Sequence, residues 1–319
     1  MIENAIILAG GFGTRLHPLT LDTPKALLPV GNRPFLETQF YRLRQAGVKR
    51  VVLSVFHQAA QMKKALKGLD KFGLKVSLAK EPKPLGTGGA IAFAWPDKTK
   101  PCLVLNGDVL SDFEIAPLVA AHAKTGAKAT LWVIEVRDTS AFGVIEADRL
   151  GAIRRFVEKP KAGETPSKWI NAGLYALSSE VLRLIPPGKA VSVEREVFPG
   201  LLRQGMPAFA YADQGLPYWN DIGTPKAYLN ANLDVLAGRL KLGPLWKGLK
   251  GSSVIAPGCK LGKGALIEGS LLFGGCKVGE GAQLRGVILG QGCVVGAGAS
   301  LREGAVLGKA SRISEGSRA

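Results

Sequence analysis

Near the start of the chain stands the stretch AIILAGGFGTR, residues 5–15, in which five apolar residues run into a glycine-rich loop. A short, continuous apolar run is typical of a strand buried on both faces of a parallel sheet. The three glycines that follow let backbone N–H groups approach a phosphate chain more closely than a loop with side chains could. The stretch therefore predicts an α/β fold with a phosphate-binding loop after its first strand.

Two common phosphate-binding loops do not fit this stretch. The loop of P-loop nucleotide hydrolases needs the pattern G-x-x-x-x-G-K-[ST], which the chain lacks. A dinucleotide-binding fingerprint built from Gly11 and Gly13 requires glycine or alanine at position 16, where Leu16 stands. Arg15 and Lys25 instead add fixed positive charge that suits a polyphosphate.

Further apolar runs and amphipathic stretches alternate along the first part of the chain. We expect strands at Val51–Val55, Leu74–Ala79, Cys102–Asn106 and Ala129–Val136. We expect helices among them at Pro34–Ala46, Gln58–Leu69, Gly88–Trp95 and Ile115–Lys124. This alternation is typical of a Rossmann-like α/β domain, whose mostly parallel sheet is covered by helices. Ligands of such sheets bind beyond the carboxyl ends of the strands, so we expect the site in the loops after Ala9 and Asn106.

The pattern changes at residue 238, which we predict to be the end of a first domain, residues 1–238. Residues 239–253 lose the rhythm and predict a connector. In residues 254–319 an aliphatic or aromatic residue recurs every six residues, with two intervals of five, at Ile255, Leu261, Ile267, Phe273, Val278, Leu284, Leu289, Val295, Leu301, Leu307 and Ile313. Such a step, with glycine easing the corners, predicts a triangular parallel β-helix whose interior these residues fill.

Three cysteines of this repeat, Cys259, Cys276 and Cys293, are spaced 17 residues apart, which is one coil of the predicted β-helix. We expect them to stack as small packing residues that face inward, rather than to form a metal or redox ladder. Some β-helices of this type use a histidine for acyl transfer, but the histidines of this chain all stand before residue 238. The repeat is therefore expected to serve homo-oligomerisation or regulation.

The chain is strongly basic, with 42 lysines and arginines against 25 acidic residues and a formal charge of +17. This balance fits an anionic partner, which could be nucleic acid, an acidic membrane or a phosphorylated small molecule. Aromatic residues are only 7% of the chain and do not interleave with a basic run, so we expect no specific nucleic-acid partner. The lack of a signal sequence or of roughly 18 consecutive apolar residues, together with only four cysteines, favours a cytoplasmic protein without a membrane partner.

The segment ILAGGFGTRLHPLTLDTPKALLPVGNRPFLE, residues 7–37, resembles the signature of the sugar nucleotidyltransferases, or nucleotide-sugar pyrophosphorylases. Five further motifs follow in order, namely PLGTGG at 84–89, LNGD at 105–108, FVEKP at 156–160, NAGLY at 171–175 and NDIGTP at 220–225. A nucleotidyltransferase domain followed by a left-handed β-helix of hexapeptide repeats is also an arrangement of this family, notably of its mannose-1-phosphate guanylyltransferases (GDP-mannose pyrophosphorylases).

The resemblance implies transfer of a nucleotidyl group from a nucleoside triphosphate to a sugar 1-phosphate, with release of pyrophosphate. It implies catalytic roles for Arg15, Lys25 and Asp108, and a Mg²⁺ site made by Asp108 and Asp221. Magnesium suits two carboxylates, because it prefers phosphate oxygens and waters for its remaining ligands. The nucleotide would be bound by Leu8, Ala9, Gly10, Gly11, Gly13, Thr14, Glu81, Pro84, Gly86 and Thr87. The sugar phosphate would be bound by Gly143, Glu158, Lys159, Asn171 and Asp221.

Glu81 bears on the choice of base. Members of the family that use UTP or dTTP usually have glutamine at the equivalent place, whose amide matches the mixed donor and acceptor edge of those bases. A carboxylate can accept from both N1–H and N2–H₂ of guanine, so Glu81 predicts GTP. The alternative is that Glu81 is only a solvent-facing strand residue.

The sugar is predicted from the resemblance alone. The segment Val193–Pro199, the turn Asp221–Pro225 and the β-helix are most similar to mannose 1-phosphate enzymes, which makes mannose the first choice. The stretch Gly86–Ile91 departs from the Gly-Thr-Ala-Gly usual in those enzymes and resembles heptose 1-phosphate guanylyltransferases, the second choice. Thymidylyl, uridylyl or adenylyl transfer to glucose 1-phosphate is the third.

A non-catalytic regulatory relative is the rival from another class. Such proteins share the two-domain plan but can lose the charged residues of the site. This chain keeps Arg15, Lys25, Asp108 and Asp221, which favours an enzyme.

Overall fold

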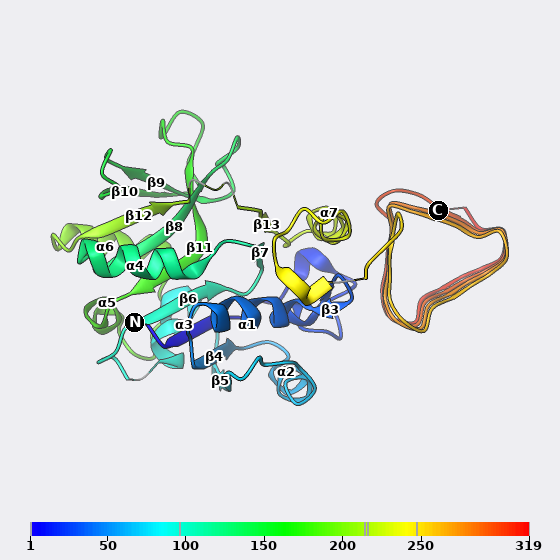
Figure 1. Cartoon of the computed structure of the whole chain (residues 1–319), viewed down its shortest axis with the longest axis horizontal. Coiled ribbons are helices and arrows are strands. Elements are labelled where there is room, and N and C mark those ends of the chain that lie inside the picture. The colour runs from blue at the N-terminus through cyan, green and yellow to red at the C-terminus, as the bar shows by residue number, and fades with distance from the viewer. Residues whose placement is uncertain (1, 96, 214, 216, 247, 319) are drawn as a thin grey trace.

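The computed structural model describes residues 2–95, 97–213, 215, 217–246 and 248–318. Figure 1 shows a helix-covered sheet in the first part of the chain and a stack of triangular coils at its C-terminal end. Among the described residues, no helix combines the length and the apolar character that crossing a bilayer requires.

The parallel part of the main sheet has the strand order β6-β1-β4-β5. These strands are β1 (Asn4–Leu8), β4 (Arg50–Val55), β5 (Lys75–Lys80) and β6 (Cys102–Asn106). Their bounds confirm the four strands predicted there. The apolar runs of β6, β1 and β4 form inner strands whose faces are both covered, and β5 forms the edge of the sheet.

The other half of the sheet makes the whole mixed rather than mostly parallel. Strand β11 (Trp169–Leu177) runs antiparallel to β6, to β8 (Ala129–Glu135) and to β9 (Gly143–Ala147). Strand β10 (Ile153–Glu158) pairs antiparallel with β9, and β12 (Ala208–Ala212) pairs parallel with β8. A short turn joins β9 to β10, and strands joined in this way pair antiparallel.

Helices cover both faces of this sheet (Figure 1). The core on one face includes residues of α1 (Phe35–Gln45), α2 (Ala59–Ala65) and α4 (Ile115–Thr125). The core on the other face includes residues of α3 (Gly86–Ala94), α5 (Ser179–Leu184) and α6 (Phe198–Arg203). Neighbouring residues of β1 show the alternation, because Ile6 and Ile7 are both fully buried but belong to opposite cores. The four predicted helices are confirmed, although α2 ends four residues before the expected Leu69.

Single-turn helices and two-stranded ribbons connect these layers. The single-turn helices are η1 (Thr14–Leu16), η2 (Lys25–Leu27), the π-helical η3 (Val193–Val197) and η4 (Gly243–Trp246). Two antiparallel ribbons pair β2 (Pro29–Val30) with β3 (Arg33–Pro34), and β7 (Val109–Ser111) with β13 (Trp219–Asp221). Helix α7 (Pro225–Leu236) follows the second ribbon.

The C-terminal repeat forms the predicted parallel β-helix, with three parallel sheets of short strands. The first sheet contains β14 (Val254–Ile255), β17 (Leu271–Leu272), β20 (Ile288–Leu289) and β23 (Val306–Leu307). The second contains β15 (Lys260–Leu261), β18 (Lys277–Val278), β21 (Val294–Val295) and β24 (Arg312–Ile313). The third contains β16 (Leu266–Glu268), β19 (Gln283–Arg285) and β22 (Ser300–Leu301).

Two residues predicted to fill the interior of the repeat lie outside its core. Leu261, in the first coil, is 48% exposed. Leu272, not Phe273, pairs with Ile255 and Leu289 and is fully buried inside the β-helix. Phe273 instead packs against the apolar cluster between the two domains. Adjacent residues of a strand point to opposite faces, so an error of one position exchanges inside for outside.

The three spaced cysteines pack as expected. Cys276 and Cys293 are fully buried in the β-helix core, and Cys259 is partly buried against it. Each thiol donates to a backbone carbonyl, at 3.2 Å for Cys259 and Cys276 and 3.0 Å for Cys293.

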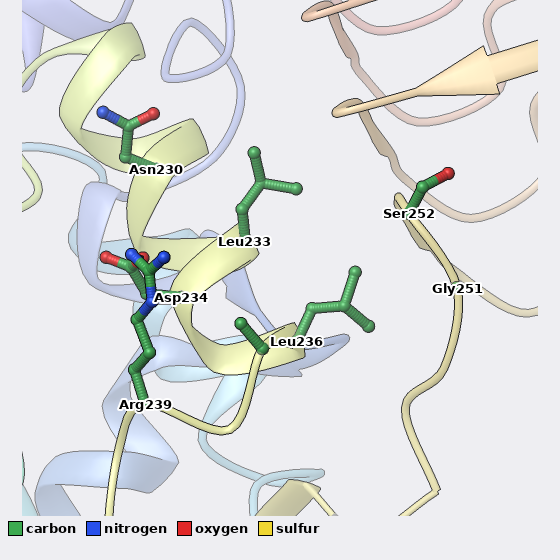
Figure 2. Close-up of a pocket in the computed structure, with 8 residues that line it drawn as sticks. Asn230, Leu233, Asp234, Leu236, Arg239, Gly251 and Ser252 are labelled. Atoms are coloured by element: carbon green, nitrogen blue, oxygen red, sulfur yellow. The ribbon is translucent and has the colours of Figure 1, made fainter.

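The β-helix packs side-on against the first domain. Val254, Leu271 and Ile288, on the outer face of its first sheet, share an apolar cluster with Tyr228 and Val235 of α7. Beside this contact a hollow of about 580 Å³ lies between α7 and the segment Gly251–Ser252 (Figure 2).

Side chains of α7 line this hollow, together with Arg239, which follows the helix. Leu233 and Leu236 point into it, and Arg239 forms a 2.6 Å ion pair with Asp234. None of the predicted site residues lines the hollow, whereas eight of them lie at the carboxyl edge of the main sheet.

Candidate active site

A cavity of about 360 Å³ opens at the carboxyl ends of β1 and β6; we name it the β1–β6 cavity. It is lined by Leu8, Gly10, Gly11, Phe12, Phe56, Glu81, Pro84, Leu85, Gly86, Thr87, Ala90, Asn106, Gly107 and Asp108. Eight predicted site residues are in this lining, so the structure brings the glycine-rich loop, the PLGTGG motif and the LNGD motif together. Ala9, Gly13 and Thr14 belong to the same loop but do not line the cavity.

Glycine is needed where the two loops meet. A Cβ on Gly107 would lie 2.4 Å from the carbonyl oxygen of Leu8, a separation that real Cβ atoms do not show. The Gly107 N–H donates to that same carbonyl at 2.9 Å. A Cβ on Gly10 would lie 3.0 Å from Oε1 of Glu81. A Cβ on Gly11 would meet no atom within 4 Å, so packing does not require glycine there.

Glu81 is only 5% exposed, so the alternative of a solvent-facing strand residue is wrong. Its Oε1 accepts from the Ser54 hydroxyl at 3.0 Å, and its Oε2 accepts from the Leu85 N–H at 3.1 Å. These two bonds fix the carboxylate at the cavity wall. A carboxylate has about four lone-pair positions, so about two remain for a ligand.

Four charged residues gather beside the cavity; we name Arg15, Lys25, Asp108 and Asp221 the charged cluster. Lys25 Nζ lies 2.8 Å from Asp108 Oδ2, and Arg15 Nη2 lies 3.9 Å from Asp221 Oδ2. The Arg15 side chain is 62% exposed, which leaves most of its guanidinium free to bind an anion.

The two aspartates are held together by the β7–β13 ribbon. Asp221 pairs with Val109 in this ribbon, and the Ile222 N–H donates to the Asp108 carbonyl at 3.1 Å. After the ribbon Thr224 caps α7 by accepting from the Ala227 N–H, with proline at the first helical position. The Asp-x-Gly-Thr-Pro motif is therefore a strand end followed by a helix start.

The surroundings of Asp221 disfavour the charged form of its carboxyl group. Burial, followed by the nearby Asp108 carboxylate, raises the pKa of Asp221, although Lys25 and Arg15 oppose this effect. Its Oδ1 is buried and has no hydrogen-bond partner among the described residues. A buried carboxylate oxygen without a hydrogen-bond partner is unusual and indicates a position where a ligand binds.

The aspartate pair fits a magnesium ion. Among the described residues no group of three or more His, Cys, Asp or Glu side chains could hold a metal ion. Magnesium needs no such cage, because phosphate oxygens and waters complete its octahedron. Asp108 and the unpartnered Oδ1 of Asp221 match that preference.

A second group of predicted site residues lies on β9, β10 and β11; we name Gly143, Glu158 and Asn171 the β9–β11 group. Gly143 pairs with Glu158, and a Cβ on Gly143 would lie 2.9 Å from Glu158 Oε2 and 4.0 Å from the Asn171 Cβ. Asn171 donates to the Tyr175 hydroxyl at 2.7 Å and accepts from the Gly173 N–H at 3.0 Å. The structure thus brings Gly143, Glu158 and Asn171 together.

The β9–β11 group adjoins the charged cluster. A Cβ on Gly173 would lie 2.9 Å from Asn106 Nδ2, and the Trp219 indole donates to the Ala172 carbonyl at 3.0 Å. Asn106 and Trp219 each stand two residues before an aspartate of the cluster. Lys159 follows the last residue of β10, has a positive φ of 52° and lowers the pKa of Glu158 against the larger effect of burial.

Three residues that sequence reasoning did not select belong to this region. Asn106 lines the β1–β6 cavity, and its buried Oδ1 lacks a partner among the described residues. Phe12 is 48% exposed at the cavity rim, with its ring 5.7 Å from that of Phe56. Glu194 accepts from the Thr87 hydroxyl at 2.7 Å. Each stands inside a motif quoted above, but only contacts in space single it out.

Comparisons with known proteins agree with this geometry. Residues 4–238 match the Nucleotidyl transferase family, and residues 248–318 match the GMPPB C-terminal domain. The chain is 37% identical over 273 residues to mannose-1-phosphate guanylyltransferase of Mycobacterium tuberculosis, covering 85% of this chain and 75% of that protein. It is 39% identical over 271 residues to mannose-1-phosphate guanylyltransferase catalytic subunit beta of Drosophila melanogaster, covering 82% and 71%.

Solved structures share the architecture of the first domain. HddC from Yersinia pseudotuberculosis complexed with GMP-PN has a TM-score of 0.61 and 28% identity, over 72% of this chain and 98% of that chain. UDP-glucose pyrophosphorylase complexed with UDP-glucose has a TM-score of 0.65 over 75% and 100%, and at 21% identity it shows the fold alone. Because the first family match covers most of the chain, this protein belongs to the nucleotidyl transferase family, alongside the two mannose-1-phosphate guanylyltransferases.

Proposed function

We propose that this enzyme transfers GMP from GTP to mannose 1-phosphate, giving GDP-mannose and pyrophosphate. The observation that carries the proposal is the charged cluster, in which two cations and two carboxylates from distant segments meet between the β1–β6 cavity and the β9–β11 group. The names of the relatives at 37–39% identity support mannose and guanine.

The reaction needs no nucleophilic side chain. An anionic oxygen of the sugar phosphate attacks the α-phosphorus, and the bond from that phosphorus to the oxygen bridging to the β-phosphorus breaks. Arg15 and Lys25 neutralise the negative charge that gathers on the departing pyrophosphate. Asp108 and Asp221 would hold Mg²⁺, which when bound acts as a Lewis acid on phosphate oxygens. The remaining task of the protein is to orient two anions for in-line attack.

Glu81 supports guanine as the base. Ser54 and Leu85 hold its carboxylate at the wall of the β1–β6 cavity and leave acceptor positions free. Guanine offers two adjacent N–H donors on its Watson–Crick edge, whereas uracil and thymine offer one donor between two acceptors. The guanine analogue in a related structure is consistent with this assignment.

The β9–β11 group supports the sugar end of the substrate. Glu158 and Asn171 offer an acceptor and an amide to sugar hydroxyls, and Lys159, the next residue after Glu158, would bind the phosphate. Heptose 1-phosphate is the second candidate, because Gly88 stands where alanine is usual in mannose enzymes.

The test is a matrix of GTP, UTP, dTTP, ATP and CTP against the 1-phosphates of mannose, heptose and glucose, with pyrophosphate release as readout. We expect the highest kcat/KM for GTP with mannose 1-phosphate, and loss of activity with EDTA. A preference for UTP or dTTP would reject the assignment of Glu81. No release from any pair would favour a regulatory relative.

We also propose that the enzyme is a homo-oligomer through its β-helix and acts in the cytoplasm. All four cysteines are free thiols, as suits a reducing compartment. Light scattering of the full chain and of a chain ending at residue 238 would measure whether the β-helix drives oligomerisation. Equal oligomeric states of the two chains would contradict the proposal.

A further inference from the structure

We propose that Glu194 is the second carboxylate of the sugar site, and that it selects the sugar together with Glu158. The inference rests on the proposed function, since it concerns the sugar that this same site accepts. It also assigns Thr87 a positioning role, because the hydroxyl of Thr87 holds Glu194.

The position of Glu194 is fixed by two hydroxyl groups. Thr87 Oγ1 donates to Glu194 Oε2 at 2.7 Å, and Ser192 Oγ donates to the same oxygen at 2.8 Å. Thr87 Oγ1 also accepts from the Val193 N–H at 2.9 Å, and Ser192 Oγ accepts from the Arg195 N–H at 3.2 Å. Both hydroxyl protons therefore point at one oxygen of Glu194, and the other oxygen is left for a ligand.

The segment that carries Glu194 lies against the strand that ends at Glu158. The turn η3 (Val193–Val197) packs against β10 (Ile153–Glu158). Burial and then the charge of Glu194 raise the pKa of Glu158. Burial and then the same charge also raise the pKa of the Tyr175 hydroxyl, to which Asn171 donates.

Within the described part of the chain, neither Glu158 nor Glu194 forms an ion pair within 4.0 Å. Burial and the charge of Glu194 outweigh the opposing effect of Lys159 and Arg195, so the pKa of Glu158 stays raised. Neutral hydroxyl donors would relieve the two carboxylates by charge-assisted hydrogen bonds. A sugar 1-phosphate has the matching polarity, because its anionic end suits Arg15 and Lys25 while its hydroxyls suit the carboxylates.

The glycines of PLGTGG explain how Glu194 reaches this position. A Cβ on Gly86 would lie 2.6 Å from the Val191 carbonyl oxygen, and one on Gly89 would lie 2.3 Å from that of Lys189. The N–H of Gly88 donates to the Val191 carbonyl at 2.8 Å. The segment before Glu194 therefore packs directly on the backbone of this loop.

Gly88 is where the motif departs from the pattern usual in mannose enzymes. A Cβ there would lie 3.1 Å from Val191 Cγ1 and 3.2 Å from the Val191 carbonyl oxygen, closer than ordinary contacts. An alanine would therefore move the segment that carries Glu194. The choice of residue at position 88 thus acts on the sugar site through Glu194.

The experiment compares Glu194→Gln with Glu196→Gln, a matched control on the same turn. Glu196 is exposed and accepts from the Ser192 N–H, which glutamine can still do. For each variant, kcat/KM is measured with mannose 1-phosphate, glucose 1-phosphate and the singly deoxygenated mannose 1-phosphates, and KM is measured for GTP.

In the wild type, loss of the hydroxyl that Glu194 reads should cost roughly 10–100-fold in kcat/KM. In Glu194→Gln that penalty should shrink by about tenfold, with the KM for GTP within about twofold of the wild type. Thr87→Val should act in the same direction, and Thr87→Ser should restore the wild-type profile. Glu196→Gln should leave the profile unchanged.

The inference fails if Glu194→Gln keeps the wild-type deoxy-sugar profile, or if its defect is confined to GTP binding. Failure of the proposed function is a different result, in which the wild type forms no nucleotide sugar from any pair. Melting temperatures of all variants distinguish a local change from unfolding.

Discussion

Lys25 Nζ lies 2.8 Å from Asp108 Oδ2, although 83 residues separate the two positions. The lysine begins the single turn η2, and the aspartate follows the central strand β6. Their contact places a lysine beside the β1–β6 cavity, which Asp108 lines.

Lys25→Ala should reduce kcat/KM by roughly 10²–10³, because a preorganised cation for the pyrophosphate is lost and Asp108 loses its partner. Steady-state pyrophosphate release measures the effect. Lys128→Ala is the control, since Lys128 pairs with Glu180 at 2.6 Å outside the site. Comparable activity in the two variants would remove Lys25 from the mechanism.

Asp221→Asn should make the metal-free protein more stable while abolishing most activity. The pKa of Asp221 is raised, so its proton stabilises the fold below the pKa of an unfolded aspartate, and that stabilisation is lost as the pH rises through the raised pKa. At neutral pH the ionised carboxylate therefore opposes folding, and asparagine removes this charge.

Thermal melting at pH 7 in EDTA checks this prediction. The Tm of Asp221→Asn should exceed that of the wild type by a few degrees. At pH 4 the difference should shrink, because the wild-type carboxylate then gains its proton. Added Mg²⁺ should raise the Tm of the wild type more than that of the variant. An Asp221→Asn protein with a lower Tm in EDTA would contradict the electrostatic account.

Much of this site could be predicted from the sequence, because its motifs lie at strand ends. Leu8, Asn106 and their following loops come from adjacent parallel strands, and such ends must meet at one edge of a sheet. The partnership of Asp108 with Asp221 could not be derived this way, since it depends on the β7–β13 ribbon. It followed only from family resemblance.

Other features were beyond sequence reasoning for physical reasons. Strands β9 and β10 mix exposed and buried residues, and their antiparallel pairing follows from short turns rather than from apolar runs. Glu194 stands in an acidic and basic run that looks solvated in sequence, and only its bond from Thr87 places it in the site. Leu272 and Phe273 are adjacent and both apolar, so the sequence does not distinguish which of them faces the interior of the β-helix.

Glu81→Gln should lower kcat/KM for GTP by roughly 10–100-fold, the range for losing a hydrogen bond to a charged group. The glutamine can still accept from Leu85, so the fold of the cavity wall should persist. Activity with UTP or dTTP should rise relative to GTP, because an amide matches their mixed edge. The nucleotide matrix described above measures the ratio. An unchanged GTP preference would show that Glu81 does not read the base.

Gly107→Ala should destabilise the first domain by about 1–3 kcal/mol, because its Cβ would lie 2.4 Å from the Leu8 carbonyl oxygen. Gly11→Ala is the matched control, since no atom lies within 4 Å of the added Cβ. Urea unfolding followed by tryptophan fluorescence gives the difference. If both variants unfold at the same urea concentration, the loops after β1 and β6 are not in the close contact described.

Leu272→Ala and Phe273→Ala test which residue fills the β-helix. Leu272 is fully buried, so its truncation should cost about 2–5 kcal/mol. Phe273 is only partly buried against the interdomain cluster, so its loss should cost less and should act on the contact with the first domain. Cys276 stands four residues after Leu272, as Cys259 and Cys293 stand four after Ile255 and Leu289, which supports this register. Differential scanning calorimetry of both variants decides the matter: a larger loss for Phe273→Ala would restore the six-residue step that the sequence first predicted.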